Sequence, residues 1–499
     1  MDVAWLGRAA TTAYLVVLAL LCVYGLHRLF LVTVYFLVRR RAPQAPACFR
    51  DLPRVTVQLP MFNERNVARR VIESACALDY PADKLEIQVL DDSNDETTDI
   101  AREVIERMRS RGVNVSLCRR ADRVGYKAGA LAEGLKHAQG EFIAIFDADF
   151  VPPPGLLREV IDHFTDPGVG MVQCRWDHLN REDSLLTKAQ AVLLDGHFLI
   201  EHTARNRSGR FMSFNGTAGV WRRSAIEDSG GWSHDTLTED LDLSYRAQLR
   251  GWKFVFLPGL TAPAELPPEM NAFKAQQHRW TKGGAQTCVK LLPSVLRTAP
   301  GWRVKLEAFF HLTSGLVYIL MVLLSLLLGP AMVDKLGSTD DPISWRLALD
   351  LLLFFVGTGS ALAFYIASQR ATQRPWSKTL ASVPALMALG IGIAFNNAVA
   401  AIEGLFQKSG EFVRTPKFGG APAARGQRGS WPRMRGTWKA WVELALAAYM
   451  ATFLAMLFFT DGWLERVSAA LPFLGLFIFG YAYVAIQSLR AQWAARPNV

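Results

Sequence analysis

The chain has 499 residues, 51% of them hydrophobic, and its formal net charge is +10 at pH 7. The length allows an enzyme domain plus further material, and the hydrophobic share is high for a purely water-soluble protein. Lys and Arg cluster beside apolar runs, which is typical of the cytosolic face of a membrane, so we expect a lipid bilayer as partner and no nucleic acid. The six cysteines form no CxxC or metal-like spacing, which predicts reduced thiols.

The first segment predicts a membrane-spanning helix. The range 11–38 is almost uninterrupted apolar sequence, longer than the roughly 20 residues that a spanning helix needs. Three arginines follow at once, at 39–41, whereas a signal peptide has its positive charge before the apolar region. We therefore expect residues 1–41 to form a first span that holds the next domain in the cytosol.

Residues 42–290 predict a cytosolic α/β domain, which begins with a proline-containing linker over 42–53. Predicted strands are Val55–Leu59, Leu85–Leu90, Val113–Leu117, Phe142–Phe146, Gly170–Gln173 and Phe254–Leu257. Predicted helices alternate with them, notably at Asn66–Ala77, Glu96–Ser110 and Lys127–Ala138. This alternation favours a mostly parallel sheet, and such sheets bind ligands beyond the carboxyl ends of their strands. A GxGxxG motif and a P-loop are both missing from the sequence, so neither a dinucleotide fold nor an ATPase is supported.

Two carboxylates, Asp147 and Asp149, directly follow the apolar strand Phe142–Phe146. Carboxylates at this spacing suit Mg²⁺ or Mn²⁺, and such a cation would neutralise the phosphates of a leaving diphosphate. A DxD pattern also arises by chance in acidic loops. The apolar strand before Asp147, and Phe150 with three prolines after the motif, favour a metal site over a chance match.

Other polar motifs lie at strand ends or helix starts. Asp91 and Asp92 close the second strand, where carboxylates bind a nucleobase or ribose, or cap the next helix. Lys127 opens a helix whose N-terminal amides suit an anionic ligand, although a surface lysine is common at such a place. Asn215 and Gly216 begin a small-residue turn that either lets a backbone approach a ligand closely or is a plain hairpin turn.

The motif Thr238-Glu239-Asp240 could supply a general base that removes a proton from an attacking hydroxyl. The alternative is a capping threonine with acidic first-turn residues, which would stabilise a helix over Leu241–Arg250.

The stretch Gln276-Gln277-His278-Arg279-Trp280 precedes the next apolar run. Arg279 could clamp a diphosphate with its planar guanidinium, and Trp280 offers a flat face for a sugar ring. The same two side chains would also suit a membrane interface, with the indole in the aromatic belt and the guanidinium reaching toward water.

We expect an interfacial helix over 291–305 and then a membrane region over 306–499, giving about five to six transmembrane segments in all. The apolar blocks lie at about Leu306–Val333, Leu347–Ala367, Leu380–Leu405, Trp441–Thr460 and Leu471–Ile486. The acidic loop 334–341 predicts an external position, and the basic segments 370–378 and 408–439 predict cytosolic ones. Both flanks of the block 380–405 therefore favour the same side. We predict that this block is re-entrant or interfacial, with a break near Gly390, Gly392, Asn396 and Asn397, the alternative being an ordinary span that violates the charge rule.

As a set, these motifs resemble the membrane-embedded family-2 glycosyltransferases of the cellulose synthase superfamily. The stretches most similar to the plant cellulose-synthase-like A and C proteins are Leu59–Glu64, Gln88–Ser93, Gly125–Leu131, Phe146–Phe150, Phe214–Trp221 and Gln276–Trp280. The resemblance is strong over about 55–290 and covers the membrane part only in layout. It implies a GT-A domain, the α/β nucleotide-sugar-binding fold, joined to an α-helical transmembrane domain.

The resemblance also implies roles for single residues. By this resemblance, the nucleoside pocket would be lined by Pro60, Glu64, Asp91 and Asp92. The side chains that bind the sugar-diphosphate donor and the metal would be Lys127, Asp147, Asp149, Gln276 and Arg279. Its acceptor-side and catalytic groups would be Asn215, Gly216, Trp280 and the carboxylates of Glu239 and Asp240, with Asp240 as the base. The segment 412–417, within a cytosolic loop at 406–439, is similar in place to the loop that closes over the nucleotide in this superfamily.

The implied activity is an inverting, metal-dependent transfer of a hexose from GDP-mannose or UDP-glucose to a growing β-linked glycan, with export through the enzyme's own membrane helices. An alternative is transfer of one sugar to a membrane lipid. A transporter or channel is disfavoured, because the spans contain few charges and no paired inverted repeat. The short chain favours a bacterial inner membrane with the catalytic domain in the cytosol. These residue types do not determine the donor, the linkage or the product length.

Overall fold

The computed structural model describes residues 3–337, 345–373, 376–407, 417, 419, 437–460 and 462–494. Within these ranges seven strands form one sheet in the order β3-β2-β1-β4-β6-β5-β7. The strands are β1 (Val55–Met61), β2 (Leu85–Asp91), β3 (Val115–Cys118), β4 (Phe142–Ile145), β5 (Val169–His178), β6 (Gly219–Arg222) and β7 (Lys253–Ala264). Only β6 runs against its neighbours, so the predicted mostly parallel sheet is confirmed.

Helices cover both faces of the sheet. Three pack on one face, α2 (Ala68–Cys76), α3 (Thr97–Arg109) and α5 (Leu156–Ile161). Three pack on the other, α4 (Tyr126–His137), α8 (Arg223–Asp228) and α9 (Glu239–Leu249). Val55, Val57 and Leu59 alternate along β1 and are fully buried in the first core. Burial of each such side chain contributes roughly 1.5–3 kcal/mol, which explains why this central strand is apolar.

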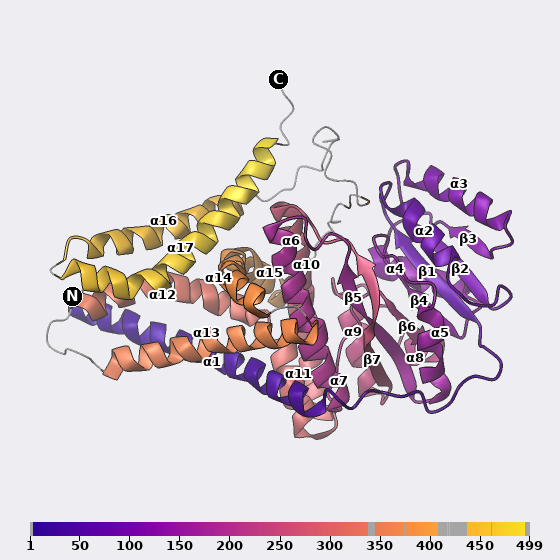
Figure 1. Cartoon of the computed structure of the whole chain (residues 1–499), viewed down its shortest axis with the longest axis horizontal. Coiled ribbons are helices and arrows are strands. Elements are labelled where there is room, and N and C mark those ends of the chain that lie inside the picture. The colour runs from indigo at the N-terminus through magenta and orange to yellow at the C-terminus, as the bar shows by residue number, and fades with distance from the viewer. Residues whose placement is uncertain are drawn as a thin grey trace.

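A helical segment between β5 and β6 packs against the apolar helices that are described below. It consists of α6 (Leu185–Asp195), the π-helix η2 (Gly196–His202) and α7 (Thr203–Arg207). The long helix α10 (Met270–Thr298) lies beside it, and both stand between the sheet and the apolar helices (Figure 1). The two parts of the molecule therefore meet through helices rather than through the sheet.

The apolar helices gather on the side away from the sheet (Figure 1). They are α1 (Val3–Val38), α11 (Gly301–Leu312), α12 (Leu316–Gly337), α13 (Trp345–Ala371), α14 (Trp376–Gly392), α15 (Ala394–Leu405), α16 (Thr437–Leu457) and α17 (Trp463–Ala494). In the described residues, four helices are long and apolar enough to cross a membrane, or up to six if each of two bent pairs is one span. This range includes the five to six segments predicted from the sequence.

One bent pair lies in the block that we predicted to be broken. The ranges Val383–Gly392 and Ala394–Leu405 meet at an angle of 45°. The bend falls at Ile393, between the glycines and the asparagines named above. A bent pair at this place is either a broken span or a re-entrant loop.

Two other expectations meet the structure differently. The range 291–305 is not one helix, because α10 continues to Thr298 and α11 begins at Gly301. A proline at 300 explains the division, since it cannot continue the hydrogen bonding of the helix before it. The segment 412–417 lies outside the described residues except for Lys417.

Candidate active site

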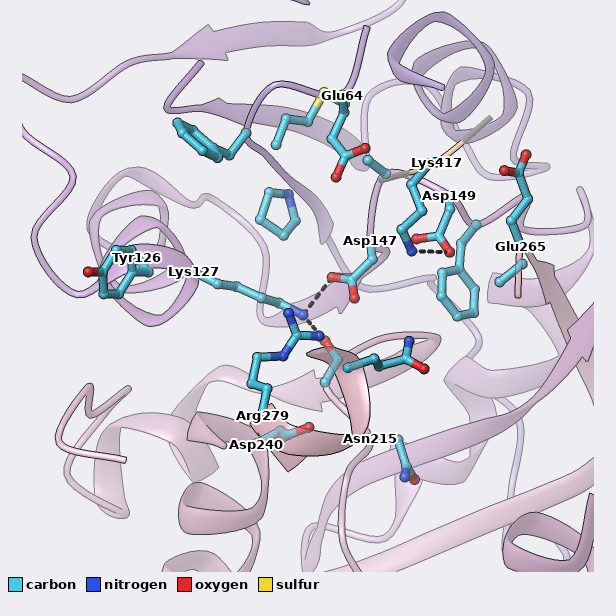
Figure 2. A pocket seen from close by; sticks show the side chains of 18 of the residues that line it. Glu64, Tyr126, Lys127, Asp147, Asp149, Asn215, Asp240, Glu265, Arg279 and Lys417 are labelled. Carbon is cyan, nitrogen blue, oxygen red and sulfur yellow. Dashed lines mark hydrogen bonds and ion pairs between the residues drawn. The ribbon is translucent and has the colours of Figure 1, made fainter. Parts of the chain in front are cut away.

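A cavity lies at the carboxyl edge of the parallel strands (Figure 2). Most of the predicted site residues line it, namely Pro60, Glu64, Asp92, Lys127, Asp147, Asp149, Asn215, Gly216, Glu239, Asp240, Gln276, Arg279 and Trp280. They come from the ends of β1, β2 and β4, from the starts of α4 and α9, from the loop before β6 and from α10. Strand and helix ends meet at this edge because six of the seven strands run the same way.

Lys127 occupies the centre of the cavity (Figure 2). Its Nζ lies 2.5 Å from Asp147 Oδ1 and donates to the carbonyl oxygen of Gly216 at 2.9 Å. Glu239 Oε1 lies 3.9 Å from the same ammonium group. Burial alone would lower the pKa of Lys127, but Asp147 and Glu239 raise it above its ordinary value. The side chain is therefore a fixed positive charge, suited to an anionic ligand.

The loop over 214–218 links several parts of the site. Thr217 Oγ1 accepts from the backbone N–H of Asp147 at 2.8 Å, and Gly216 holds Lys127 as described. Gly216 has a φ of +78°, and a Cβ there would lie 2.9 Å from Asp240 Oδ2. A glycine is required at this position because the backbone is left-handed and passes close to a carboxylate. The small-residue turn thus brings the backbone close to Asp240, and the approach of a ligand to this backbone stays a prediction.

Asp240 lies in the first turn of α9 and faces the cavity. Its Oδ1 accepts from the backbone N–H of Leu241 at 2.8 Å. Enclosure by the surrounding protein raises the pKa of Asp240 above its ordinary value, the neighbouring Glu239 raises it further, and Lys127 opposes both. A carboxyl group with a raised pKa is a stronger base once it is ionised, which suits proton removal from a hydroxyl group.

The helix α10 has two polar faces. Gln276, Arg279 and Trp280 share the face that lines the cavity, because Arg279 and Trp280 follow Gln276 by three and four residues. The opposite face contacts the apolar helices through its own polar side chains. These contacts are Lys274 with Glu443 at 2.7 Å, Lys282 with Glu403 at 3.0 Å and His278 with Glu403 at 3.2 Å. One helix therefore connects the cavity to α15 and α16.

Arg279 is enclosed among carboxylates. Burial lowers the pKa of its guanidinium below the ordinary value, and Glu239, Asp147 and Asp240 act against that shift. Arginine nevertheless stays charged in proteins, so this group offers a permanent cation beside Asp147.

Lys417 reaches the cavity from a segment far along the chain. Its Nζ lies 2.6 Å from Asp149 Oδ2, and its backbone carbonyl accepts from Asn66 Nδ2 at 2.8 Å. Nearby, Glu265 pairs with Arg70 at 2.8 Å. The sequence placed Lys417 in the loop that resembles the nucleotide-covering segment, but the contact with Asp149 could not be read from it.

Asp91 is the one predicted site residue that does not line the cavity. It is buried, and its carboxylate accepts from the Ser93 backbone at 2.9 Å and from Thr98 Oγ1 at 2.6 Å. These bonds tie the end of β2 to α3. Asp92 does line the cavity, and it pairs with Arg120 through a 3.0 Å bond from Nε.

Several lining residues were missed by the sequence reasoning. Arg123 lies over the Phe62 ring, with 3.3 Å from Cζ to the ring centroid, and 4.9 Å from the centroid of Tyr126. Trp176 and His178 lie two residues apart on β5, and alternation along a strand places both on the same face. The Trp176 and Trp280 rings are 6.4 Å apart at their centroids. The longer β5 explains this miss, because the predicted strand ended at Gln173.

The carboxylates of Asp147 and Asp149 are hard oxygen donors that suit Mg²⁺ or Mn²⁺. In the described residues no group of three or more His, Cys, Asp or Glu could hold a metal ion. Asp147 and Asp149 are therefore considered as a pair of ligands. Such a donor set fits a cation whose remaining ligands are phosphate oxygens and water, which is how Mg²⁺ usually binds with a phosphate substrate.

The fold and the sequence show which known proteins this chain resembles. Residues 53–283 match the family described as "Glycosyltransferase like family 2", and the predicted GT-A fold is confirmed for this part of the chain. A mannosyltransferase from Pyrobaculum calidifontis, solved in complex with GDP-Man and Mn²⁺, has a similar structure. The TM-score is 0.53 at 22% identity, over 79% of this chain and 100% of that one.

The chain is also similar to curated proteins that share one printed activity. Glucomannan 4-beta-mannosyltransferase 2 of Arabidopsis thaliana is 46% identical over 252 residues, which are 50% of this chain and 47% of the relative. Probable glucomannan 4-beta-mannosyltransferase 9 of Oryza sativa subsp. japonica is 38% identical over 335 residues, 61% of this chain and 62% of the relative. The chain spans about half the length of curated relatives such as the Arabidopsis protein named above. The resemblance to the mannan and glucomannan synthase branch is thereby confirmed.

Proposed function

We propose that this protein transfers a hexose from a nucleotide sugar to the end of a growing β-linked glycan, with inversion at the anomeric carbon. GDP-mannose is the first donor to test, since the plant relatives are named as glucomannan mannosyltransferases and the similar structure from Pyrobaculum calidifontis holds GDP-Man. One observation carries the proposal. Lys127 joins Asp147 to Gly216, and Gly216 lies next to Asp240, so the groups that we propose for the diphosphate and for the base line one cavity.

In the proposed reaction Asp240 removes the proton from an acceptor hydroxyl. The hydroxyl oxygen then forms a bond to the anomeric carbon of the donor while the bond from that carbon to the diphosphate breaks on the opposite side. The proton remains on Asp240, and the electron pair leaves with the diphosphate. Arg279 and Lys127 stabilise the negative charge of this leaving group. An α-linked nucleotide sugar therefore gives a β-glycoside.

We propose that Asp147 and Asp149 hold a divalent cation, Mg²⁺ or Mn²⁺, together with the diphosphate. When bound, the cation supplies Lewis-acid neutralisation of the phosphate charge. The mannosyltransferase from Pyrobaculum calidifontis, which was solved with Mn²⁺, supports a metal requirement. Lys417 lies close enough to Asp149 to add a further positive charge at the same end of the cavity.

The nucleoside would lie by Pro60, Glu64 and Asp92, and the acceptor sugar by Trp280 and the loop at Gly216. We further propose that the glycan leaves through the apolar helices and that the catalytic domain faces the cytosol. The basic segments beside the apolar runs support this orientation. A bacterial inner membrane stays a prediction, and the relatives named above are plant proteins.

The test uses purified full-length protein in lipid nanodiscs with Mg²⁺ or Mn²⁺. Labelled GDP-mannose, UDP-glucose, UDP-galactose and UDP-N-acetylglucosamine are offered in turn, and any product is digested with linkage-specific glycanases. We expect a high-mass glycan, sensitive to a β-1,4-mannanase, from GDP-mannose. Label that appears only in the lipid extract would refute polymer synthesis and leave single-sugar transfer to a lipid.

A further inference from the structure

Next to the 214–218 loop lies a partly buried network of polar side chains that contains only one of the predicted site residues, Asn215. Its first members are His197 and His202 of the π-helix η2. The Asn215 side chain is 2.6 Å from His202 Nε2 through Oδ1 and 2.9 Å from His197 Nε2 through Nδ2. The Asn215 backbone N–H donates to Gln173 Oε1 at 3.0 Å. The side chain of Asn215 is therefore engaged by the protein itself.

These contacts determine where the hydrogens lie. An amide nitrogen can only donate, so His197 Nε2 accepts and its proton is on Nδ1, which faces Glu201 Oε2 at 3.2 Å. An amide oxygen can only accept, so His202 carries its proton on Nε2. Consistently, His202 Nδ1 is buried with no hydrogen-bond partner among the described residues. Burial above all, and with it the nearby positive charge of Arg205, lower the pKa of His202 well below its ordinary value, so this ring is neutral.

The π-helix explains how two histidines reach one amide. His197 and His202 are five residues apart, and a π-helix repeats its hydrogen bonds from residue i to i+5, which brings these positions to the same face. Their ring centroids are 4.3 Å apart. In an α-helix the same two positions would point in different directions. The unusual helix is therefore needed for the contact with Asn215.

The network of polar side chains continues from η2 to the apolar helices. Glu201 lies 3.4 Å from Arg205, and Arg205 Nε donates to Glu307 of α11 at 2.9 Å. Glu307 also contacts His27 of α1 at 2.9 Å. Burial alone would raise the pKa of Glu201, but Arg205, His197 and Arg28 together lower it below its ordinary value. The network thus contains ionised groups, and the free-energy cost of burying them is offset only while their oppositely charged partners stay in place.

We propose that His197 and His202 are positioning residues, which hold the 214–218 loop in its active arrangement and depend on Glu307 and His27 in the apolar helices for their own position. The loop in turn holds Lys127 through Gly216 and the Asp147 backbone through Thr217. Packing of α1 and α11 therefore sets the geometry of the reacting groups. This inference rests on the proposed function for its kinetic consequences, but not for its structural ones.

The test compares full-length variants in nanodiscs. His202→Leu removes the donor to Asn215, His202→Gln keeps an N–H, and Glu307→Gln weakens the anchor in α11. We expect roughly tenfold lower kcat for His202→Leu and for Glu307→Gln, with donor KM changed less than threefold, and recovery of most activity in His202→Gln. Adding Asn215→Ala to His202→Leu should cause no loss beyond that of Asn215→Ala alone, because both act through one contact.

A second readout is independent of turnover. Amide hydrogen exchange of the peptide over 211–222 should rise several-fold in His202→Leu and in Glu307→Gln. The matched control is Gln369→Leu, which removes another buried contact to the apolar helices, the 2.9 Å bond to Asp195. Unchanged exchange in both variants, or an equal rise in the control, would overturn the inference. If the native protein turns over no nucleotide sugar, the proposed function fails, and the exchange result still decides this inference.

Discussion

The most direct test of the chemistry is the substitution Asp240→Asn. The asparagine side chain has nearly the same volume, and its amide oxygen can still accept the 2.8 Å bond from the Leu241 N–H. The substitution therefore removes the negative charge and the basic oxygen but keeps the local structure. The loss of a positioned general base reduces rates by about 10²–10⁴-fold, which corresponds to about 3–5 kcal/mol of activation free energy.

The raised pKa of Asp240 predicts effects on stability with a definite sign. A carboxyl group whose folded-state pKa exceeds its unfolded value binds a proton more tightly in the folded protein. It contributes stability that is fully present below the unfolded pKa and is lost as pH rises through the folded pKa. Asp240→Asn removes this loss, so we expect its Tm at pH 8 to equal or exceed that of the native protein. For the same reason, the native rate should rise as pH increases from the ordinary carboxyl range toward neutrality.

The assay measures label transfer from the nucleotide sugar, nucleotide binding by equilibrium titration and Tm, with Glu239→Gln as the control. We expect Asp240→Asn to lose transfer while it binds nucleotide with an affinity within threefold of native. The control changes the neighbouring carboxylate and should keep measurable turnover. Loss of nucleotide binding together with a lower Tm in Asp240→Asn would mean that the residue is structural, and the reasoning would be wrong.

Three further predictions concern the donor, the metal and the acceptor. Lys127→Met should weaken nucleotide-sugar binding at least tenfold, because it removes the cation that contacts Asp147 and Gly216; unchanged donor KM would contradict this role. EDTA should abolish transfer by the native protein, and added Mn²⁺ or Mg²⁺ should restore it. Asp147→Asn should stay inactive at saturating metal. Rescue of this variant by metal would mean that Asp147 is not a metal ligand. Trp280→Ala should raise the acceptor KM about 2- to 10-fold and Trp280→Phe less, with donor KM unchanged; equal effects of both would argue against stacking on the sugar.

The sheet and most of the site could be predicted because they depend on short-range patterns. Apolar runs ended by Asp147 or by Pro60 are local signals, and parallel strands bring such ends to one edge. The strand β6 was missed because its four residues follow directly on the small-residue turn. Its reversal matters, since it brings the 214–218 loop to the ligand edge from the start of a strand rather than from its end.

Contacts between distant segments could not be predicted in this way. Lys417 and Asp149 are far apart in sequence, and no local pattern connects them. The contact of His202 with Asn215 depends on a π-helix, whose single-turn geometry leaves no clear apolar period. Asp91 shows the opposite case, in which a residue type suited to a ligand is used by the fold, here to bond Thr98.

The two polar faces of α10 have a consequence for protein engineering. The predicted domain boundary at residue 290 falls inside this helix, which runs to Thr298. A hybrid that joins this catalytic domain to the membrane helices of a relative must therefore match Lys274 and Lys282 with carboxylates from the new partner. A one-residue insertion between these lysines would rotate the residues after it around the helix axis. Either Arg279 would then no longer line the cavity, or the lysines would lose their contacts with Glu443 and Glu403. A hybrid avoids that conflict if its two joints lie in the linker over 42–53 and after α10. It must also keep the helices α15 and α16 of this chain.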